Sequence, residues 1–266
     1  MLDQYKREIN YLRISVTDRC NLRCTYCMPA EGIQLMQHDD IMTFEEICDV
    51  VREGVSQGIN KIRLTGGEPL VRKGIVELVS KISKIDGVED LAMTTNGILL
   101  DKYANDLSKA GLNRVNISLD TMSPEKFSEI TRGGNINKVF DGINAAKKAG
   151  LTPIKINCVV FKNRNEEDAK QVAKFCQETG LSIRYIHQMD LKTGDFSIVE
   201  GGEGGDCKSC NRLRLTANGE IRPCLFNDMS YQVKKEGVKG AYKDALGNKP
   251  KAGTKSLSGN FYGIGG

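Results

Sequence analysis

Apolar residues along the chain follow two alternating periods. Short apolar runs are typical of buried strands, and apolar residues that recur every three or four positions are typical of helices. Thr43 and Glu46 have the form of a capping box before one helical stretch, and Ser123 with Pro124 starts another. We expect strands at 11–16, 61–65, 91–95, 114–119, 154–160 and 183–187. Helices are expected from Thr43 to Gly58, at 75–85, up to Ala110, from Ser123, and at 139–149 and 166–178.

Six strands that alternate with helices predict an α/β fold whose parallel sheet has helices on the outside. Right-handed connections curl such a sheet toward a barrel, but six units are too few to close the usual eight-unit barrel. We therefore expect a partial β/α barrel, open along one side, that binds ligands at the carboxyl ends of its strands. Residues 1–190 would form this barrel, and residues 191–266 would form a C-terminal segment.

Three cysteines follow the first strand at the spacing C-x3-C-x2-C, and we call Cys20, Cys24 and Cys27 the first triplet. Three thiolates at this spacing can bind three corners of a cubic iron-sulfur cluster and leave the fourth iron open. An open iron can chelate the amine and carboxylate of S-adenosylmethionine, and the stretch closely resembles the signature of radical S-adenosylmethionine enzymes. The alternatives are a zinc site completed by His38, or buried thiols.

A second triplet, Cys207, Cys210 and Cys224, lies in the C-terminal segment at the spacing C-x2-C-x13-C. This segment is too short and polar to make its own core, so a metal centre would hold it across the opening of the barrel. A zinc knuckle is the alternative, but beside the first triplet a second iron-sulfur cluster is favoured. The remaining cysteines are expected to be small core residues: Cys48, Cys158 and Cys176.

Polar and glycine residues mark the ends of several expected strands. Gly66 and Gly67 offer close access to the backbone, and Glu68 offers a carboxylate for an ammonium group. Radical enzymes of this class carry such a motif to hold the methionine amine. Asn96 and Ser118 end the next two strands, within expected reach of the ribose and carboxylate of the same ligand.

Basic residues interrupt four of the apolar strands: Arg13, Lys61, Arg63, Lys155 and Arg184. They could point outward toward helix carboxylates, but an inward set would form a cationic lining for a polyphosphate. The net charge is +4, and residues 207–266 hold 11 Lys and Arg against 4 Asp and Glu. These charges are sparse, so an anionic small molecule is a simpler partner than nucleic acid.

The chain shows no apolar run that would span a membrane and no signal-peptide pattern. We therefore expect a cytoplasmic protein without a membrane partner. Nine cysteines in a reducing compartment favour metal binding or catalysis over disulfides.

Four motifs resemble those of the MoaA-type GTP 3',8-cyclases, radical enzymes of molybdenum cofactor biosynthesis. They are LRISVTDRC at 12–20, CTYCMP at 24–29, KIRLTGGEP at 61–69 and CKSCNRLR at 207–214, and the final Gly265-Gly266 also matches. The similarity covers 11–189 and 206–226. The chain departs from the family in having only residues 192–206 between the sixth strand and the second triplet, in His187-Gln188 before Met189, and in a short ending after Phe226.

The resemblance implies two 4Fe-4S clusters, one on each triplet, with S-adenosylmethionine on the first. A 5'-deoxyadenosyl radical would take the 3' hydrogen of GTP, and the ribose radical would attack C8 of guanine, which meets the open iron of the second cluster. Cofactor-binding residues would be Tyr26, Gly66, Gly67, Glu68, Thr94, Asn96, Ser118 and Met189. Substrate-binding residues would be Arg13, Lys61, Arg63, Lys155, Arg184, Arg212 and Arg214. The resemblance also gives a role in catalysis to Arg212, Arg214, Gly265 and Gly266.

The expected partners are GTP or a related nucleotide and a low-potential electron donor such as flavodoxin or ferredoxin, with a homodimer possible and no nucleic acid. The alternative function is a radical enzyme with one auxiliary cluster that modifies a different nucleotide or a peptide. A protein of another class, a non-catalytic iron-sulfur or zinc protein, would leave residues 66–69 without a purpose.

Overall fold

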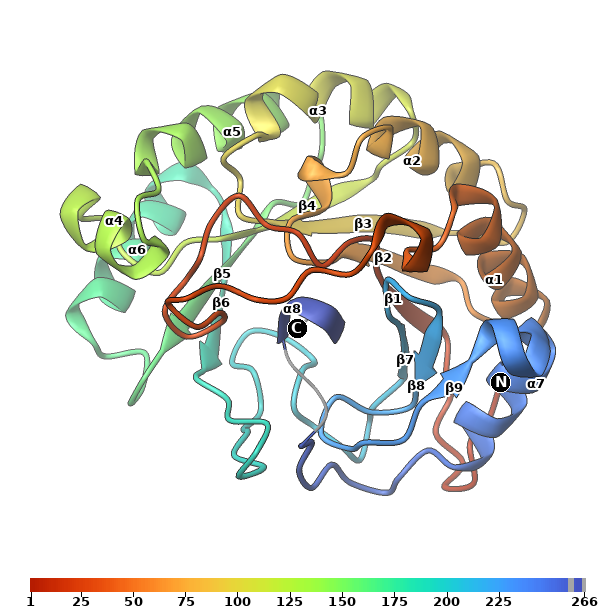
Figure 1. Cartoon of the computed structure of the whole chain (residues 1–266). Helices are drawn as coiled ribbons and strands as arrows, with labels where there is room; N and C mark the ends of the chain where they lie inside the picture. Colours follow the sequence, from red (N-terminus) through yellow and green to blue (C-terminus); the bar gives the residue numbers. More distant parts are fainter. Residues whose placement is uncertain (258–260, 265–266) are drawn as a thin grey trace.

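The computed structural model describes residues 1–257 and 261–264. A nine-stranded sheet with the order β6-β5-β4-β3-β2-β1-β7-β8-β9 curves around a hollow (Figure 1). The two outer strands of this order, β6 and β9, are not paired with each other. The expected partial barrel, open along one side, is therefore confirmed. In the described residues no helix is long and apolar enough to cross a membrane.

The first six strands pair in parallel and in chain order, as the alternating pattern predicts. Each lies within a residue or two of its expected bounds. They are β1 (Tyr11–Ser15), β2 (Lys61–Thr65), β3 (Asp90–Thr95), β4 (Arg114–Ser118), β5 (Lys155–Val160) and β6 (Ser182–His187).

Helices line the outside of the sheet (Figure 1). They are α1 (Phe44–Ser56), α2 (Ile75–Ser83), α3 (Leu100–Lys109), α4 (Pro124–Thr131), α5 (Ile136–Lys148) and α6 (Glu167–Thr179), with 3-10 turns η1 (His38–Asp40) and η2 (Pro69–Val71). The capping box of α1 is confirmed, because the Glu46 amide donates to Thr43 Oγ1 at 3.2 Å and the Thr43 amide donates to Glu46 Oε2 at 2.7 Å. Cys48, Cys158 and Cys176 are buried in the core, as expected.

The C-terminal segment extends the sheet. Its elements are β7 (Arg212–Leu215), β8 (Glu220–Arg222), β9 (Tyr231–Gln232), α7 (Val233–Gly247) and α8 (Phe261–Ile264). β7 lies parallel to β1, and its Leu213 and Leu215 join the core of the barrel. α7 packs on α1, where the Tyr242 hydroxyl donates to the Val50 carbonyl oxygen at 3.0 Å. The sequence pattern did not predict these strands or α7, and the division near residue 190 stays a prediction.

Candidate active site

The first triplet lines a cavity of about 210 Å³ at the carboxyl ends of β1 to β6. All eight residues expected to bind S-adenosylmethionine line this cavity, although they come from strand ends and loops spread over most of the chain: Tyr26, Gly66, Gly67, Glu68, Thr94, Asn96, Ser118 and Met189. The parallel strands bring them together, because their carboxyl ends meet at the same edge of the sheet.

The two glycines of the loop after β2 are required by the neighbouring cysteine loop. Gly66 has φ +151°, and a Cβ on it would lie 2.6 Å from the Thr17 carbonyl oxygen. A Cβ on Gly67 would lie 2.4 Å from the carbonyl oxygen of Arg19. The Gly67 amide donates to Thr17 O at 2.8 Å, so the two backbones are in direct contact. The glycines therefore fix the first triplet against β2, whether or not a ligand also touches them.

Glu68 is fully buried, and both of its carboxylate oxygens accept hydrogen bonds. Oε1 accepts from the Leu70 amide at 3.0 Å and from Thr95 Oγ1 at 2.7 Å, and Oε2 accepts from the Asn96 amide at 2.7 Å. Burial raises the pKa of this carboxyl from 4.5 to about 7, against the effect of these bonds. A carboxylate has about four lone-pair sites, so an ammonium group could still be accepted. Glu68 thus joins the loops after β2 and β3.

Two buried polar atoms beside this cavity have no partner among the described residues. They are Thr94 Oγ1 and Asn157 Oδ1. Buried polar groups are normally paired, so these atoms favour a polar ligand. Asn157 also lines the second cavity described below, together with Ile186 and Met189, so the two cavities adjoin. The sequence analysis missed Asn157, although a polar residue inside the apolar stretch 154–160 was a usable signal; the structure pairs it with Ser118 on the neighbouring strand.

A carboxylate that the sequence analysis also missed holds Tyr26. The Tyr26 hydroxyl donates to Asp120 Oδ2 at 2.7 Å, and the Val159 amide donates to Asp120 Oδ1 at 2.8 Å. Burial raises the pKa of Asp120, and burial followed by the Asp120 charge raises the pKa of Tyr26 well above its usual range. Tyr26 is thereby oriented in the wall of the cavity.

The second triplet lines a cavity of about 180 Å³ next to the first. Five arginines from β1, β2, β6 and β7 share this cavity with the thiols: Arg13, Arg63, Arg184, Arg212 and Arg214. Among the described residues, two carboxylate residues line it, Glu203 and Asp206. Burial and the charges of neighbouring arginines lower the pKa of Arg13, and burial and Arg212 lower that of Arg214 to about 10. Crowded cations in a buried place favour an anionic ligand.

Neutral side chains position these arginines. The side-chain oxygen of Asn116, in the orientation that satisfies its amide, accepts from Arg63 Nη1 at 2.8 Å and from Arg184 Nη1 at 3.1 Å. The guanidinium carbons of Arg63 and Arg212 lie 5.4 Å and 5.6 Å from the centre of the Tyr11 ring. The Nε atoms of Arg63, Arg184 and Arg212 have no partner among the described residues, so donors remain for a ligand.

Two of the seven expected substrate residues do not line the cavity. Lys61 begins β2 and lies outside the lining residues, as does Lys155 on β5. Lys155 is nevertheless close to the arginines, because burial and then the charge of Arg184 lower its pKa. The structure thus brings Arg13, Arg63, Arg184, Arg212 and Arg214 together and leaves Lys61 and Lys155 beside them.

The cysteines of both triplets carry free thiols. All nine cysteines are free. Within the part of the chain that the structure describes, no three His, Cys, Asp or Glu side chains form a group that could hold one metal ion. Thiolates that bind a cubic cluster hold three different irons and need not converge on one point. His38 lies in η1 and does not line the cavity of the first triplet, which speaks against the zinc alternative.

The short helix α8 lies inside the curve of the sheet (Figure 1). Phe261 lines the first cavity, and Gly253 lines the second, where a Cβ on it would lie 3.4 Å from Cys224 Sγ. Gly265 and Gly266, expected to act in catalysis, lie outside the described residues.

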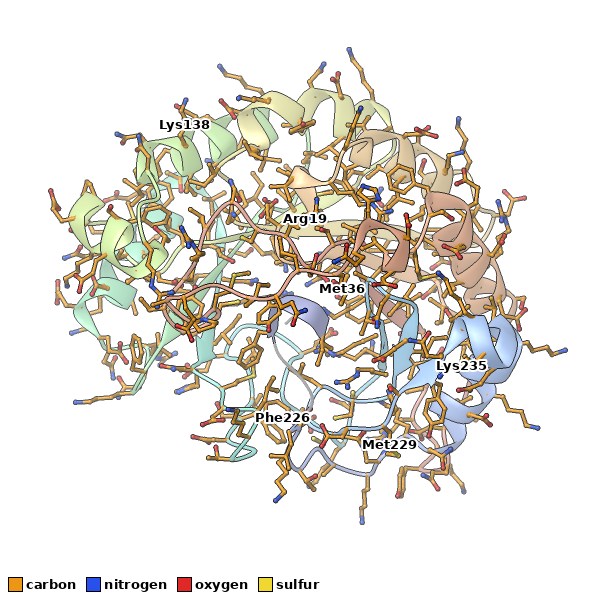
Figure 2. The ribbon with its side chains drawn as sticks, viewed as in Figure 1. Arg19, Met36, Lys138, Phe226, Met229 and Lys235 are labelled. Carbon is orange, nitrogen blue, oxygen red and sulfur yellow. The ribbon has the colours of Figure 1, made fainter. Side chains whose placement is uncertain are left out.

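The short connection after β6 forms one wall of the second cavity. The Tyr185 amide donates to the Glu200 carbonyl oxygen at 3.0 Å, so this connection pairs with the edge of β6. Phe196 stacks on Phe226, with ring centroids 4.3 Å apart. Phe226 lies on the open side of the curved sheet, away from the outer helices (Figure 2). Phe196 and Phe226 both line the second cavity, beside the second triplet.

Comparison with known proteins defines the class first. A family model described as the Radical SAM superfamily matches residues 14–176. This class uses a 4Fe-4S cluster and S-adenosylmethionine. A "GTP 3',8-cyclase" of Peptoclostridium acidaminophilum is 42% identical, with 94% of this chain and 92% of that protein covered, and one of Thermodesulfovibrio yellowstonii is 43% identical, with 92% and 91% covered. The chain therefore belongs to the radical SAM superfamily and, within it, to the GTP 3',8-cyclase family.

These relatives are longer in places. The match to the Peptoclostridium protein extends over 300 positions, more than the 266 residues of this chain, so some positions of the relative have no counterpart here. The short connection at 192–206 is consistent with such a difference.

Solved structures agree on the fold. Streptococcus suis SuiB bound to S-adenosylmethionine superposes with a TM-score of 0.66 at 15% identity, over 91% of this chain and 64% of SuiB, so this chain spans less than two thirds of that protein. Methylornithine synthase superposes with a TM-score of 0.57 at 17% identity, over 69% of this chain and 54% of the synthase.

Proposed function

We propose that the protein is a GTP 3',8-cyclase, a lyase that makes 3',8-cyclo-7,8-dihydro-GTP from GTP in molybdenum cofactor biosynthesis. The observation that carries this proposal is the arginine-lined cavity that holds the second triplet and adjoins the cavity of the first. Relatives at about 42% identity that are named for this reaction support it. The fold alone would allow many substrates.

The first cavity would bind a cluster through Cys20, Cys24 and Cys27, and S-adenosylmethionine beside it. The unpartnered Thr94 Oγ1 and the backbone after β2 fit a polar ligand with an amine, a carboxylate and a ribose. When bound, this pair of cofactors supplies the 5'-deoxyadenosyl radical. Ile186, Met189 and Asn157 line both cavities, so the two cavities adjoin there and the 5' carbon of the deoxyadenosyl group could contact the 3' carbon of GTP.

The second cavity would bind GTP. Arginine donors suit triphosphate oxygens because the planar guanidinium makes bidentate contacts. Burial, and after it the repulsion between neighbouring arginines, lowers the pKa of Arg13 and Arg214, and a bound anion would offset both effects. A second 4Fe-4S cluster on Cys207, Cys210 and Cys224 would place an open iron near the guanine base. Phe196, Phe226 and Phe261 would limit the access of water, which would otherwise quench radicals.

The electron donor and the domain division are part of the same proposal. Arg19 and Arg23 are exposed beside the first triplet. They would favour an acidic, low-potential donor such as flavodoxin or ferredoxin. Residues 191–266 would act as the segment that carries the second cluster, and a homodimer stays a prediction.

The test uses anaerobically reconstituted protein with S-adenosylmethionine, dithionite and GTP that carries deuterium at the 3' carbon. We expect deuterium in 5'-deoxyadenosine and a cyclised nucleotide, both followed by mass spectrometry. Cys24→Ala should lose both products, and Arg13→Ala should lose the nucleotide product, whereas Arg52→Ala on the outer face of α1 should keep both.

The outcomes separate the alternatives. Deoxyadenosine without a changed nucleotide would keep the radical enzyme and remove GTP as its substrate. Cluster-replete protein that makes no deoxyadenosine would contradict the radical reaction itself.

A further inference from the structure

A buried ammonium group lies beside the second triplet. Lys249 follows α7, and its side chain is one of the largest that solvent does not reach, with 2% exposed. Its Nζ donates to the carbonyl oxygen of Arg212 at 2.8 Å and to that of Pro223 at 2.6 Å. Arg212 lies two residues after Cys210, and Pro223 directly precedes Cys224. The Lys249 ammonium group therefore connects the start of β7, which follows Cys210, with the end of β8, which precedes Cys224.

A second buried cation fixes the chain on both sides of this arrangement. Arg7 donates from Nη2 to the carbonyl oxygen of Pro250 at 2.6 Å, and from Nη1 to that of Cys207 at 2.6 Å. Its Nε pairs with Asp3 Oδ2 at 2.6 Å. The Arg7 guanidinium group thus holds together the segment after Lys249 and the loop that carries Cys207, the remaining thiol of the second triplet. All three thiols of the second triplet belong to segments that these two cations organise.

Carbonyl oxygens accept from Lys249 Nζ but carry no charge, and among the described residues no carboxylate forms a salt bridge with it. A buried charge is costly unless a charge of opposite sign faces it. Cys210 and Cys224 lie on the two segments that Nζ joins, so their thiolates would be the charges that face this cation when a cluster is bound.

The first triplet is different. Among the described residues, no Lys or Arg lines the cavity of the first triplet. S-adenosylmethionine carries a sulfonium and an ammonium group, so the ligand itself brings positive charge to the first triplet. The second triplet has a cation of its own in the protein.

We propose that Lys249 is the built-in counter-ion of the second cluster, which holds its thiolates together and stabilises its reduced state. This inference rests on the proposed second cluster. One-electron reduction by an external low-potential donor, such as dithionite, adds a negative charge to a cluster. A fixed positive charge in a poorly solvated place favours that reduced state and raises its potential.

The experiment uses the full-length chain with all three cysteines of the first triplet changed to alanine, so that only the second cluster can load. After anaerobic reconstitution, iron and sulfide are counted and the cluster is titrated with dithionite while its paramagnetic resonance signal is followed. In Lys249→Met, which keeps the side-chain length and removes the charge, the midpoint potential should shift to a lower value. Lys251→Gln, an exposed lysine two residues further on, should leave it unchanged.

The midpoint potential and the iron content of these variants test the role of the Lys249 charge. Equal midpoint potentials in fully loaded Lys249→Met and the parent would overturn the proposal, as would an equal shift in Lys251→Gln. If Lys249→Met loses its iron, Lys249→Arg settles the cause: iron retained by the arginine variant supports a role of the charge, and iron lost from both assigns Lys249 to packing alone. A parent without iron would instead overturn the second cluster, and with it this inference.

Discussion

Asn116 offers a sharp test of how the substrate cavity is built, because it touches the arginines but does not line either cavity. The residue is completely buried on β4. Its oxygen accepts from Arg63 Nη1 at 2.8 Å and from Arg184 Nη1 at 3.1 Å. Asn116→Leu keeps the volume and removes this shared acceptor. Both guanidinium groups would then be free to change rotamer before GTP binds.

The magnitude follows from the cost of ordering two side chains. Immobilising a long side chain at a binding site costs about 0.5–1.5 kcal/mol, so two arginines that are no longer positioned cost about 1–3 kcal/mol on binding. Since 1.4 kcal/mol is a factor of ten, GTP should bind about 5-fold to 150-fold more weakly. S-adenosylmethionine should bind as in the wild type, because none of the residues around its cavity is changed.

Isothermal titration of cluster-loaded protein with GTP, and separately with S-adenosylmethionine, measures both quantities. Asn105→Leu, an exposed position on α3, is the matched control. A GTP affinity within twofold of the wild type would refute the claim that Asn116 positions the arginines. Equal losses for both ligands would show a general disturbance of the fold instead.

Three further results are expected. Cys24→Ala should abolish 5'-deoxyadenosine formation, whereas the core variant Cys48→Ala should keep it once loaded. The wild-type free energy of unfolding, measured by denaturant titration, should fall by at most about 3 kcal/mol between pH 4.5 and 7, because folded Glu68 keeps its proton up to about pH 7. Glu68→Gln should lack this fall. Parallel curves of unfolding free energy against pH for the two proteins would contradict a raised pKa of Glu68. Gly66→Ala, at φ +151° and 2.6 Å from a carbonyl oxygen, should lower the free energy of unfolding by about 1–3 kcal/mol and reduce the iron content. Gly247→Ala should do neither, because Gly247 has no positive φ and a Cβ on it would have open space.

The order of strands and helices could be predicted from the sequence because it depends on local patterns. The capping box at Thr43 and the strand Lys61–Thr65 appear as expected, since neighbouring residues decide them. The parallel order then follows from chain direction and handedness. With that order, Gly66, Thr94 and Ser118 are brought to the same cavity by topology alone. The spacing of the cysteines likewise predicted that the three thiols of each triplet would gather, and each set lines one cavity.

The C-terminal strands were not predictable in the same way. β7 and β8 are short, and the sheet edge that pairs with β7 belongs to β1, about two hundred residues earlier in the chain. Short strands form because a partner edge and a core are present, and neither is visible in a local pattern. The same reason hid the packing of α7 on α1.

The sequence by itself determined the alternating fold, the two sets of thiols and the residue types that surround them. The tertiary structure alone decided which charges are buried and which groups face them. Gly66 and Gly67 were expected to let a ligand approach the backbone. The structure shows that the backbone of the cysteine loop already lies against both glycines. Asp120 meets Tyr26, and Lys249 meets the strand ends of the second triplet, across large distances in sequence. Such pairs depend on long-range packing in a poorly solvated interior, which no local pattern of residues records.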